Sequence, residues 1–123
     1  MANPSTVNAT AVGKEVIRRF YVDGLAETAT VVLQGVADHI MTTISIMISN
    51  RSGNTDDKFH MIFTPDGGSD LYMLTDEPFP SQKTFIFNEK VAITGTDVIK
   101  IQGVSASSTC TMDVWCTYID QHF

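Results

Sequence analysis

The clearest pattern of apolar and polar positions lies in the stretch from Ile40 to Asn50, which reads IMTTISIMISN. Every second position from Ile40 to Ile48 carries a β-branched residue, and methionine, threonine and serine fill the positions between them. Because successive side chains of a strand point to opposite faces, this alternation predicts a β-strand whose isoleucines face a core. Such a strand is typical of the centre of a two-layer sandwich.

Similar short alternations recur along the chain and are separated by turn residues, of which Asp23-Gly24 is one example. No segment shows the apolar period of a helix. Strands are expected at 14–22, 28–33, 40–50, 58–64, 71–75, 82–87, 98–104 and 109–120, and the choice between strand and loop stays open for 88–93. About eight strands spaced in this way predict an all-β fold, a single antiparallel β-sandwich or jelly-roll-like domain.

The length of 123 residues is typical of one domain. Residues 1–13 are small, polar and without periodicity. We interpret them as an extended N-terminal arm, followed by the sandwich domain at residues 14–123. A frayed tail is the alternative, because chain ends are often disordered. If the segment is an arm, Val7 and Val12 are the residues expected to anchor it on a neighbouring molecule.

The inward-facing positions of the expected strands predict one shared core. Its members are Ile44, Ile46, Ile48, Phe59, Phe63, Phe85, Phe87, Ile99 and Ile101. The last strand alternates in the same way. Cys110, Met112, Val114, Cys116 and Tyr118 are expected on one face, and Thr111, Asp113, Trp115, Thr117 and Ile119 on the other.

Charge restricts the possible partners. The formal net charge is −6, from 8 Lys and Arg against 14 Asp and Glu. Because phosphate binding needs clustered basic residues, we expect no nucleic-acid partner. Lys14, Arg18 and Arg19 form the basic cluster of the sequence, and we interpret it as a solvated strand face rather than a phosphate site.

Cys110 and Cys116 are expected on one strand, with Cα atoms about 20 Å apart at about 3.3 Å per residue. A disulfide needs a Cα distance below about 7 Å. We therefore expect two free, buried thiols, as in a reducing compartment. The N-terminal sequence lacks the apolar segment of a signal peptide, and no stretch reaches the length of a membrane-spanning helix. These features predict no membrane partner.

Residues for catalysis are sparse. A nucleophilic triad brings a Ser or Cys together with a His and an acid. His39 is expected in a turn, His60 on the polar face of a strand and His122 at the terminus, and none of them accompanies a nucleophile motif. The spacing of the two cysteines does not suit a zinc site. We expect no enzymatic activity.

Carboxylates in two loops leave a calcium hypothesis open. Asp56 and Asp57 precede one expected strand, and Asp66 and Asp70 follow it. Calcium takes such oxygen ligands, but Asp beside Gly is equally typical of turns. We favour the turn interpretation, and we expect no cofactor.

Asp113 is unusual among the acids because it is expected in the middle of a strand. The simplest interpretation is that it faces solvent or pairs with Lys100 on a neighbouring strand. Trp115 and Ile119 share its face. An aromatic residue beside an acid on such a face is typical of a protein interface, and would also suit a second wall of the core.

The order of segments in the C-terminal half resembles that of a known family. A phenylalanine-bearing strand, TFIFNEKVAI, precedes GTDVIKIQGVSASS and a last strand that ends in TYIDQ. Upstream, ISIMISNRSGNTDDKFHMIF forms a strand ending in Asn, a polar turn and a second strand. Over residues 28–121 this order resembles small β-sandwich virion proteins of tailed bacteriophages.

The resemblance implies a structural part of a phage particle, with no catalytic residues. We expect a non-enzymatic capsid decoration (cement) protein that binds the major capsid protein shell or other virion proteins and further copies of itself. It would reside in the virion, after assembly in the bacterial cytoplasm. Val7, Val12, Trp115 and Ile119 are the expected interface residues. The alternative is a neck or tail component, or a sandwich that binds a receptor or a carbohydrate. The pair of Trp115 and Asp113 is the feature that points to carbohydrate binding.

Overall fold

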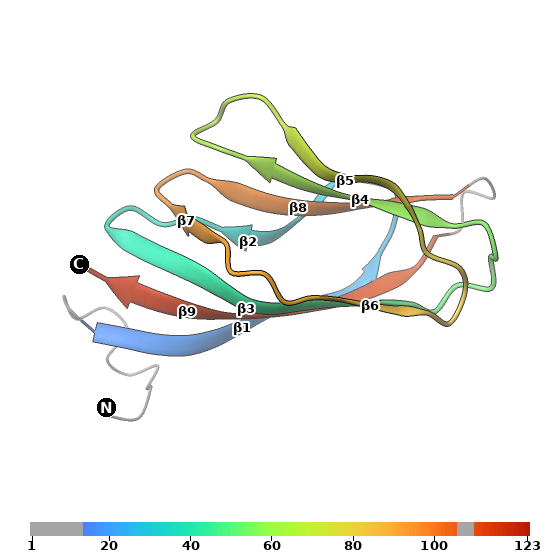
Figure 1. Cartoon of the computed structure of the whole chain (residues 1–123), viewed down its shortest axis with the longest axis horizontal. Coiled ribbons are helices and arrows are strands. Elements are labelled where there is room, and N and C mark those ends of the chain that lie inside the picture. The colour runs from blue at the N-terminus through green and yellow to red at the C-terminus, as the bar shows by residue number, and fades with distance from the viewer. Residues whose placement is uncertain (1–13, 106–109) are drawn as a thin grey trace.

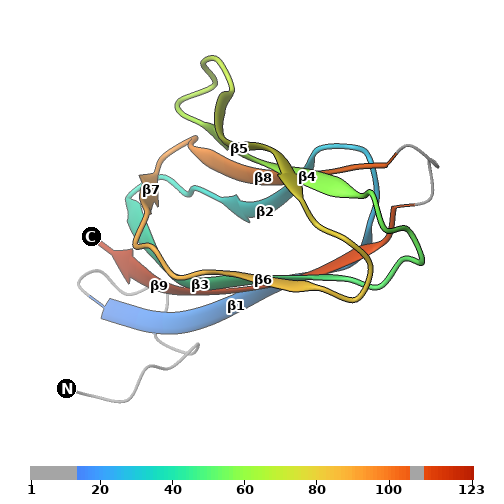
Figure 2. The same cartoon turned by 45° about the vertical axis from the view of Figure 1, so that its right-hand side comes forward.

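The computed structural model describes residues 14–105 and 110–123, which form two β-sheets packed face to face (Figures 1 and 2). The strands of the first sheet run in the order β1, β9, β3, β6, with β7 also pairing with β3, and those of the second in the order β2, β8, β4, β5. Their bounds are β1 Lys14–Leu25, β2 Thr30–Gln34, β3 His39–Asn50, β4 Lys58–Thr64, β5 Leu71–Pro78, β6 Thr84–Phe87, β7 Ala92–Thr94, β8 Val98–Val104 and β9 Met112–His122.

The chain passes from one sheet to the other at most of its connections, and all paired strands are antiparallel. This order of strands is that of a jelly roll. The predicted all-β sandwich is therefore confirmed. The described part of the chain contains nine strands rather than about eight, because the segment left open at 88–93 contributes to β7. None of the described residues belongs to a helix that could cross a membrane.

The prediction of a turn at Asp23-Gly24 is wrong. The strand β1 continues to Leu25, and its register against β9 shifts between Val22 and Leu25. Gly24 adopts a φ of 77°, which a residue without a Cβ reaches at no steric cost. The pair therefore forms a β-bulge inside one strand instead of a turn between two.

The predicted core is confirmed in eight of its nine positions. Five of the residues lie in the buried cluster between the sheets, and three phenylalanines pack against it while partly exposed. The first group is Ile46, Ile48, Phe59, Ile99 and Ile101, and the second is Phe63, Phe85 and Phe87. Ile44 is only half-buried and does not belong to the cluster.

The reason for the exception is a second bulge. The register of β3 against β9 shifts between Thr43 and Ser45, so that the alternation changes phase at Ile44. Before the shift Met41 and Thr43 point inward and Ile40 is exposed. After it, the predicted inward positions from Ile46 onward are buried. One additional residue in a strand reverses the face of every residue on one side of it.

Both cysteines are buried and unpaired, as predicted. Burial raises the pKa of the Cys110 thiol to about 11 and that of the Cys116 thiol to about 12, so neither is a thiolate nucleophile. Cys110 precedes β9 instead of lying on it. Its sulfur lies so close to Gly103 that a Cβ there would collide with it and with the Ala26 carbonyl. The glycine thus permits the close packing of the segment that leads into β9.

A buried polar cluster holds the connection between β3 and β4. The Asp57 carboxylate accepts hydrogen bonds at Oδ2 from Ser52 Oγ at 2.6 Å and from Asn50 Nδ2 at 3.2 Å. Asn50 Nδ2 also donates to the Phe79 carbonyl at 2.7 Å. Asp57 therefore has a structural role, because its cluster ties the connection between β3 and β4 to the loop that follows β5.

Candidate docking surface

Four large side chains lie side by side on the outer face of the first sheet, one from each of four neighbouring strands. Tyr21 of β1 is the register partner of Trp115 of β9, Trp115 that of Met47 of β3, and Met47 that of Ile86 of β6. The four residues are 41% to 55% exposed. We call them the outer row. Their chain neighbours Val114 and Ile48 point into the core, as the alternation of a strand requires.

The rings of the outer row are held in a defined arrangement. Those of Tyr21 and Trp115 lie 5.9 Å apart between centroids and only 17° from parallel. The Arg19 guanidinium carbon lies 5.3 Å from the Tyr21 centroid and 5.2 Å from that of Trp115. Both distances are within the range of a cation–π interaction. No ion pair of the described residues includes Arg19, so its charge is available to an incoming carboxylate.

Acids lie beside the outer row, because Asp23 and Asp113 are two positions from Tyr21 and Trp115 on β1 and β9. Arg51 donates from Nε to Asp113 Oδ2 at 2.9 Å and from Nη2 to Asp23 Oδ1 at 2.8 Å. Asp113 Oδ1 also accepts from the Gly24 amide at 3.0 Å. Burial by itself would raise the pKa of the Asp113 carboxyl, but the Gly24 amide and Arg51 outweigh it and lower that pKa. The acid therefore stays charged at neutral pH.

Of the two interpretations of Asp113, the pairing with Lys100 is wrong, whereas its side chain is 41% exposed on the outer face. Lys100 lies on β8, which belongs to the second sheet, and its ammonium is 3.3 Å from Asp70 Oδ1. Sequence spacing could not place β8 and β9 in different sheets. The Asp113 carboxylate instead forms its ion pair with Arg51, which lies in the connection after β3.

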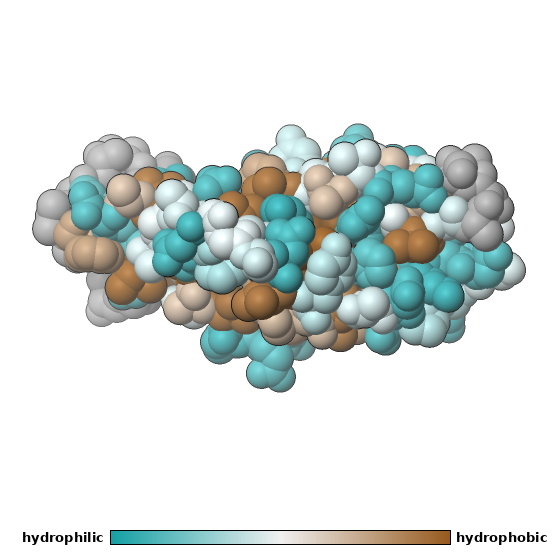
Figure 3. Space-filling model, turned by 90° about the horizontal axis from the view of Figure 1, so that it is seen from above, coloured by the Kyte–Doolittle hydropathy of each residue, from teal (hydrophilic) through white to brown (hydrophobic). Residues whose placement is uncertain are grey.

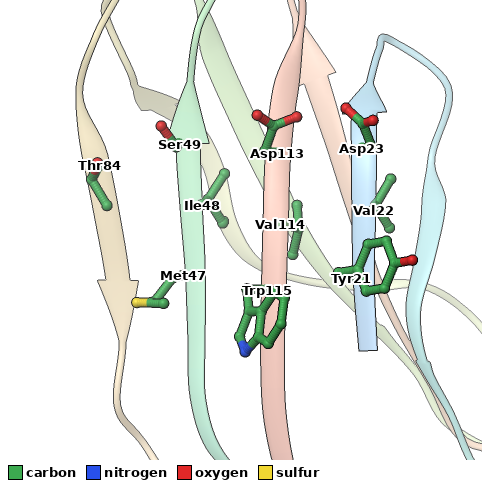
Figure 4. Close-up of a pocket in the computed structure, with 10 residues that line it drawn as sticks. All are labelled: Tyr21, Val22, Asp23, Met47, Ile48, Ser49, Thr84, Asp113, Val114 and Trp115. Atoms are coloured by element: carbon green, nitrogen blue, oxygen red, sulfur yellow. The ribbon is translucent and has the colours of Figure 1, made fainter. Parts of the chain in front are cut away.

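A shallow groove of about 420 Å³ joins the aromatic and the acidic parts of this surface. Figure 4 shows the Trp115 and Tyr21 rings at one end and the carboxylates of Asp113 and Asp23 at the other. Ser49 and Thr84 add hydroxyl groups near the acidic end. The groove thus offers apolar contact at one end and hydrogen-bond acceptors at the other.

A second group of exposed apolar residues lies on β5. Leu71, Tyr72 and Met73 are consecutive residues, yet each is 46% to 49% exposed. The register of β4 against β5 shifts twice, between Phe59 and Met61 and again at Ile62, so β5 is an irregular edge strand. Leu71 and Tyr72 pair with consecutive residues of β4 without a shift between them, so their side chains point to opposite faces of the second sheet.

These β5 residues and the outer row belong to different sheets. In Figures 1 and 2 the second sheet, with β5 at its edge, lies above the first sheet, and the outer row belongs to the lower surface. Figure 3 views the molecule from above, where apolar side chains reach the surface in several places between polar ones.

The four predicted interface residues have different outcomes. Trp115 lies in the outer row, and Ile119 is half-buried on the same face of β9. Val7 and Val12 lie outside the described residues. Sequence reasoning missed Tyr21, Met47 and Ile86, which could have been found only from the pairing of strands that are distant in sequence.

The basic cluster is a solvated face only in part, because Arg19 is exposed whereas Arg18 is half-buried. Arg18 and Arg19 are adjacent and so lie on opposite faces of β1. Arg18 Nε donates to the buried Asp120 carboxylate at 3.0 Å, and His39 Nδ1 lies 2.6 Å from the other oxygen of Asp120. His39, which begins β3 rather than lying in a turn, stacks on His122 with ring centroids 4.5 Å apart. These residues form a polar cluster where β1, β3 and β9 meet.

The acids considered for calcium do not come together. Asp57 belongs to its buried cluster, while Asp70 accepts hydrogen bonds from Thr64 Oγ1 and Lys100. Within 14–105 and 110–123 no group of three or more His, Cys, Asp or Glu residues is arranged to hold a metal ion. The acids are explained by the turns and ion pairs in which they take part.

No family model matches this chain, and no curated protein matches it. Among solved structures, one similar chain comes from Bacillus endospore appendages, described as disulfide-linked pili. It has a TM-score of 0.52 and 13% identity, over 93% of this chain and 93% of that one.

Two further similar chains come from infectious bursal disease virus, strains Gx and Gt, with TM-scores of 0.37 and 0.38 and 7% identity. This chain spans only 30% and 33% of their lengths. At such identities a likeness shows the fold alone. The likeness to the appendage chain covers 93% of this chain and is a likeness of overall fold.

Proposed function

We propose that this chain is a non-enzymatic structural protein of a tailed-phage virion, namely a capsid decoration (cement) protein that binds the major capsid protein shell. The observation that carries the proposal is the outer row. It places a tryptophan, a tyrosine, a methionine and an isoleucine across four strands of one exposed sheet face. A surface of this kind is typical of a protein interface.

The composition of the outer row matches that of binding hot spots. Trp, Tyr and Arg dominate the binding energy of most interfaces, and Trp115, Tyr21 and Arg19 contact one another here. Because these side chains hold each other in place before a partner arrives, docking would cost little side-chain entropy. Trp115 is therefore the residue whose loss should weaken capsid binding most.

The comparison with the appendage chain supports an assembly role at the level of the fold. The same sandwich occurs there in a structure described as disulfide-linked pili. This chain has two cysteines, and both are buried. We therefore expect its contacts in a particle to be non-covalent, made by exposed side chains.

The first prediction concerns Trp115. Trp115→Ala should weaken binding to capsids assembled from the major capsid protein encoded in the same genome about 30-fold, the effect of removing a hot spot of about 2 kcal/mol. Phe123→Ala is the matched control, because Phe123 is also an exposed aromatic residue but lies at the C-terminal end, beyond β9. It should bind as the unchanged protein does. Co-sedimentation with the capsids measures both, and unchanged binding by Trp115→Ala would overturn the proposed docking face.

The second prediction concerns residues 1–13, which we propose act as an arm on a neighbouring molecule. An extended segment can add to an exposed sheet edge, where main-chain hydrogen bonds supply much of the affinity. Deleting residues 1–12 should leave the melting temperature nearly unchanged and weaken capsid binding. Differential scanning fluorimetry and co-sedimentation measure the two effects. Full capsid binding by the truncated protein would show that the segment is only a tail.

A receptor-binding or carbohydrate-binding role is the second candidate. The observation in its favour is the nearly parallel Tyr21 and Trp115 rings beside Asp113 in one groove, an arrangement that could stack on a sugar ring and accept bonds from its hydroxyls. Binding of the isolated protein to a glycan array, lost in Trp115→Ala, would favour this role. Capsid binding in the absence of any glycan signal would exclude it.

A further inference from the structure

The free edge of β1 is the longest regular strand edge in the described part of the chain. β1 pairs with β9 from Lys14 to Val22 without a shift in register, and it pairs with no other described strand. Among the described strands, those at the other sheet edges are shorter or interrupted. β2, β6 and β7 have five, four and three residues, and β5 is shifted twice against β4. Native edges are usually blunted in such ways, and the edge of β1 is the exception.

We propose that two copies of this chain pair through this edge, antiparallel, with Ile17 of one copy opposite Ile17 of the other. The amides and carbonyls that point outward from β1 would then find partners in the second copy, and such main-chain bonds supply much of the affinity of strand pairing. The same surface takes part on both sides of the contact, so the contact closes with two copies and does not build a filament.

The side chains along the outer face of this edge are complementary to themselves. Glu15, Ile17 and Arg19 follow one another on this face in the order acid, apolar residue, base, because Val16 on the opposite face is buried. In an antiparallel pair centred on Ile17, Glu15 of each copy lies opposite Arg19 of the other. A pair centred on Arg19 would instead set two like charges against each other, which is destabilising.

The two charged groups have no competing ion pair. Glu15 and Arg19 are both exposed, and neither takes part in an ion pair among the described residues. Glu15 Oε2 accepts a hydrogen bond of 3.3 Å from Gln121 Nε2. Residues 1–13 contain no charged side chain, so the arm of another copy on this edge would leave both charges unmatched. The edge of a second copy matches each of them, which fixes the register.

A second order of this kind lies further along the strand, where Arg19, Tyr21 and Asp23 read base, aromatic residue, acid. Two features count against a pair centred there. The Asp23 carboxylate already binds Arg51 at 2.8 Å, and Asp23 lies where the register of β1 shifts. The register centred on Ile17 uses only the regular part of the strand.

The same contact buries apolar surface at the margin of the core. Ile17 is 49% exposed and Phe20 42%, although Phe20 is the register partner of the fully buried Cys116. A strand of a second copy beyond β1 would cover part of both side chains. Arg18 is an inward-pointing charge of the kind that protects edges, but Asp120 binds it at 3.0 Å. Its charge is therefore already matched and does not oppose the pairing.

Pairing at the edge leaves the outer row uncovered. A strand adds within the plane of a sheet, and opposite residues of an antiparallel pair point to the same face. The two outer rows would therefore lie on one side of the dimer and face the same shell. Two such sites on one body bind more tightly than one. This consequence rests on the proposed function, whereas the pairing itself does not.

Cysteine cross-linking tests the register. Opposite residues of an antiparallel pair have Cα atoms about 4.5–5.5 Å apart, within reach of a disulfide. Ile17→Cys should therefore form a linked dimer with oxidised glutathione, seen by non-reducing gel electrophoresis. The unchanged protein should not, because Cys110 and Cys116 are buried. Tyr21→Cys is the matched control. It is exposed on the same face of β1, but would lie about 26 Å from its counterpart at about 3.3 Å per residue.

Exchanging the charges tests the partners. Arg19→Asp sets acid against acid at both ends of the contact, and Glu15→Arg sets base against base. In sedimentation velocity over a concentration series, the unchanged protein should form dimers, and each variant alone should dimerise at least about tenfold more weakly. An equimolar mixture of the two variants should dimerise like the unchanged protein, because one copy then carries two acids and the other two bases.

Lys58→Asp is the matched control for charge, because it makes the same change at an exposed lysine of β4 in the second sheet. It should dimerise like the unchanged protein, and circular dichroism should show that every variant keeps the β-fold. A mixture of the charge variants that stays monomeric would overturn the pairing. So would cross-linking of Tyr21→Cys without that of Ile17→Cys. A dimer that is lost when residues 1–12 are deleted would show that the arm makes the contact instead.

The capsid assay separates this inference from the proposed function. If the unchanged protein binds capsids but stays monomeric at every concentration, and Ile17→Cys does not cross-link, edge pairing is wrong and the decoration role stands. If the protein dimerises through β1 but does not bind capsids, the pairing stands and the decoration role is wrong.

Discussion

Replacing Phe59 by alanine should lower the free energy of unfolding by about 3–5 kcal/mol. Phe59 is fully buried at the centre of the core. Its ring packs edge-on against those of Phe79 at 5.1 Å and Phe85 at 5.2 Å between centroids. These partners come from the loop after β5 and from β6 of the opposite sheet. Because partners from two separate segments pack against the ring, they cannot close together over the space it leaves, and most of the cavity would remain.

Equilibrium unfolding in urea measures this loss. Phe123→Ala serves again as the control, because Phe123 is 58% exposed, and its truncation should change stability by no more than about 0.5 kcal/mol. If Phe59→Ala cost less than about 1 kcal/mol, the packing of the second sheet onto the first would have to differ from that described here.

The core could be predicted from the sequence because burial in a sandwich follows the alternation along each strand, which is a local property. This explains why the strands Lys58–Thr64 and Val98–Val104 have the predicted bounds and why Ile99 and Ile101 are buried. The alternation of apolar and polar residues does not show where a bulge exchanges the inward-facing and outward-facing positions of a strand. The bulges at Gly24 and Ile44 arise from pairing with β9, and nothing in the neighbouring residues indicates a partner so far along the chain.

The candidate surface was predictable only in part, for the same reason. The face of Trp115 and Asp113 follows from the alternation of β9. That Tyr21 and Met47 flank Trp115 on either side depends on the register of β1 and β3, which are separated from β9 by most of the chain. Likewise the ion pair of Asp113 with Arg51 joins residues 62 positions apart in sequence. An interface that crosses four strands therefore becomes visible only once the sheet order is known.

The last prediction concerns the buried carboxylate of Asp57, which is only 1% exposed. Burial by itself would raise the pKa of this carboxyl, but hydrogen bonds from neighbouring hydroxyl and amide groups, Ser52 first among them, outweigh it and lower the pKa. Asp57→Ala would leave the buried Ser52 hydroxyl and Asn50 amide without this acceptor. It should destabilise the fold by about 3 kcal/mol at neutral pH, the upper range for hydrogen bonds to a charged group.

The same substitution should flatten the dependence of stability on pH. A carboxyl whose pKa is lower in the folded than in the unfolded state stabilises the fold above the unfolded value of about 3.9 and loses that contribution as the pH falls through the folded value. The difference in unfolding free energy between the unchanged protein and Asp57→Ala should therefore shrink as the pH is lowered below about 4. Asp56→Ala is the matched control, because Asp56 is the exposed neighbour of Asp57, and its urea unfolding curves should follow those of the unchanged protein at every pH. A gap between Asp57→Ala and the unchanged protein that stays constant with pH would show that Asp57 stabilises the loops through its shape rather than its charge.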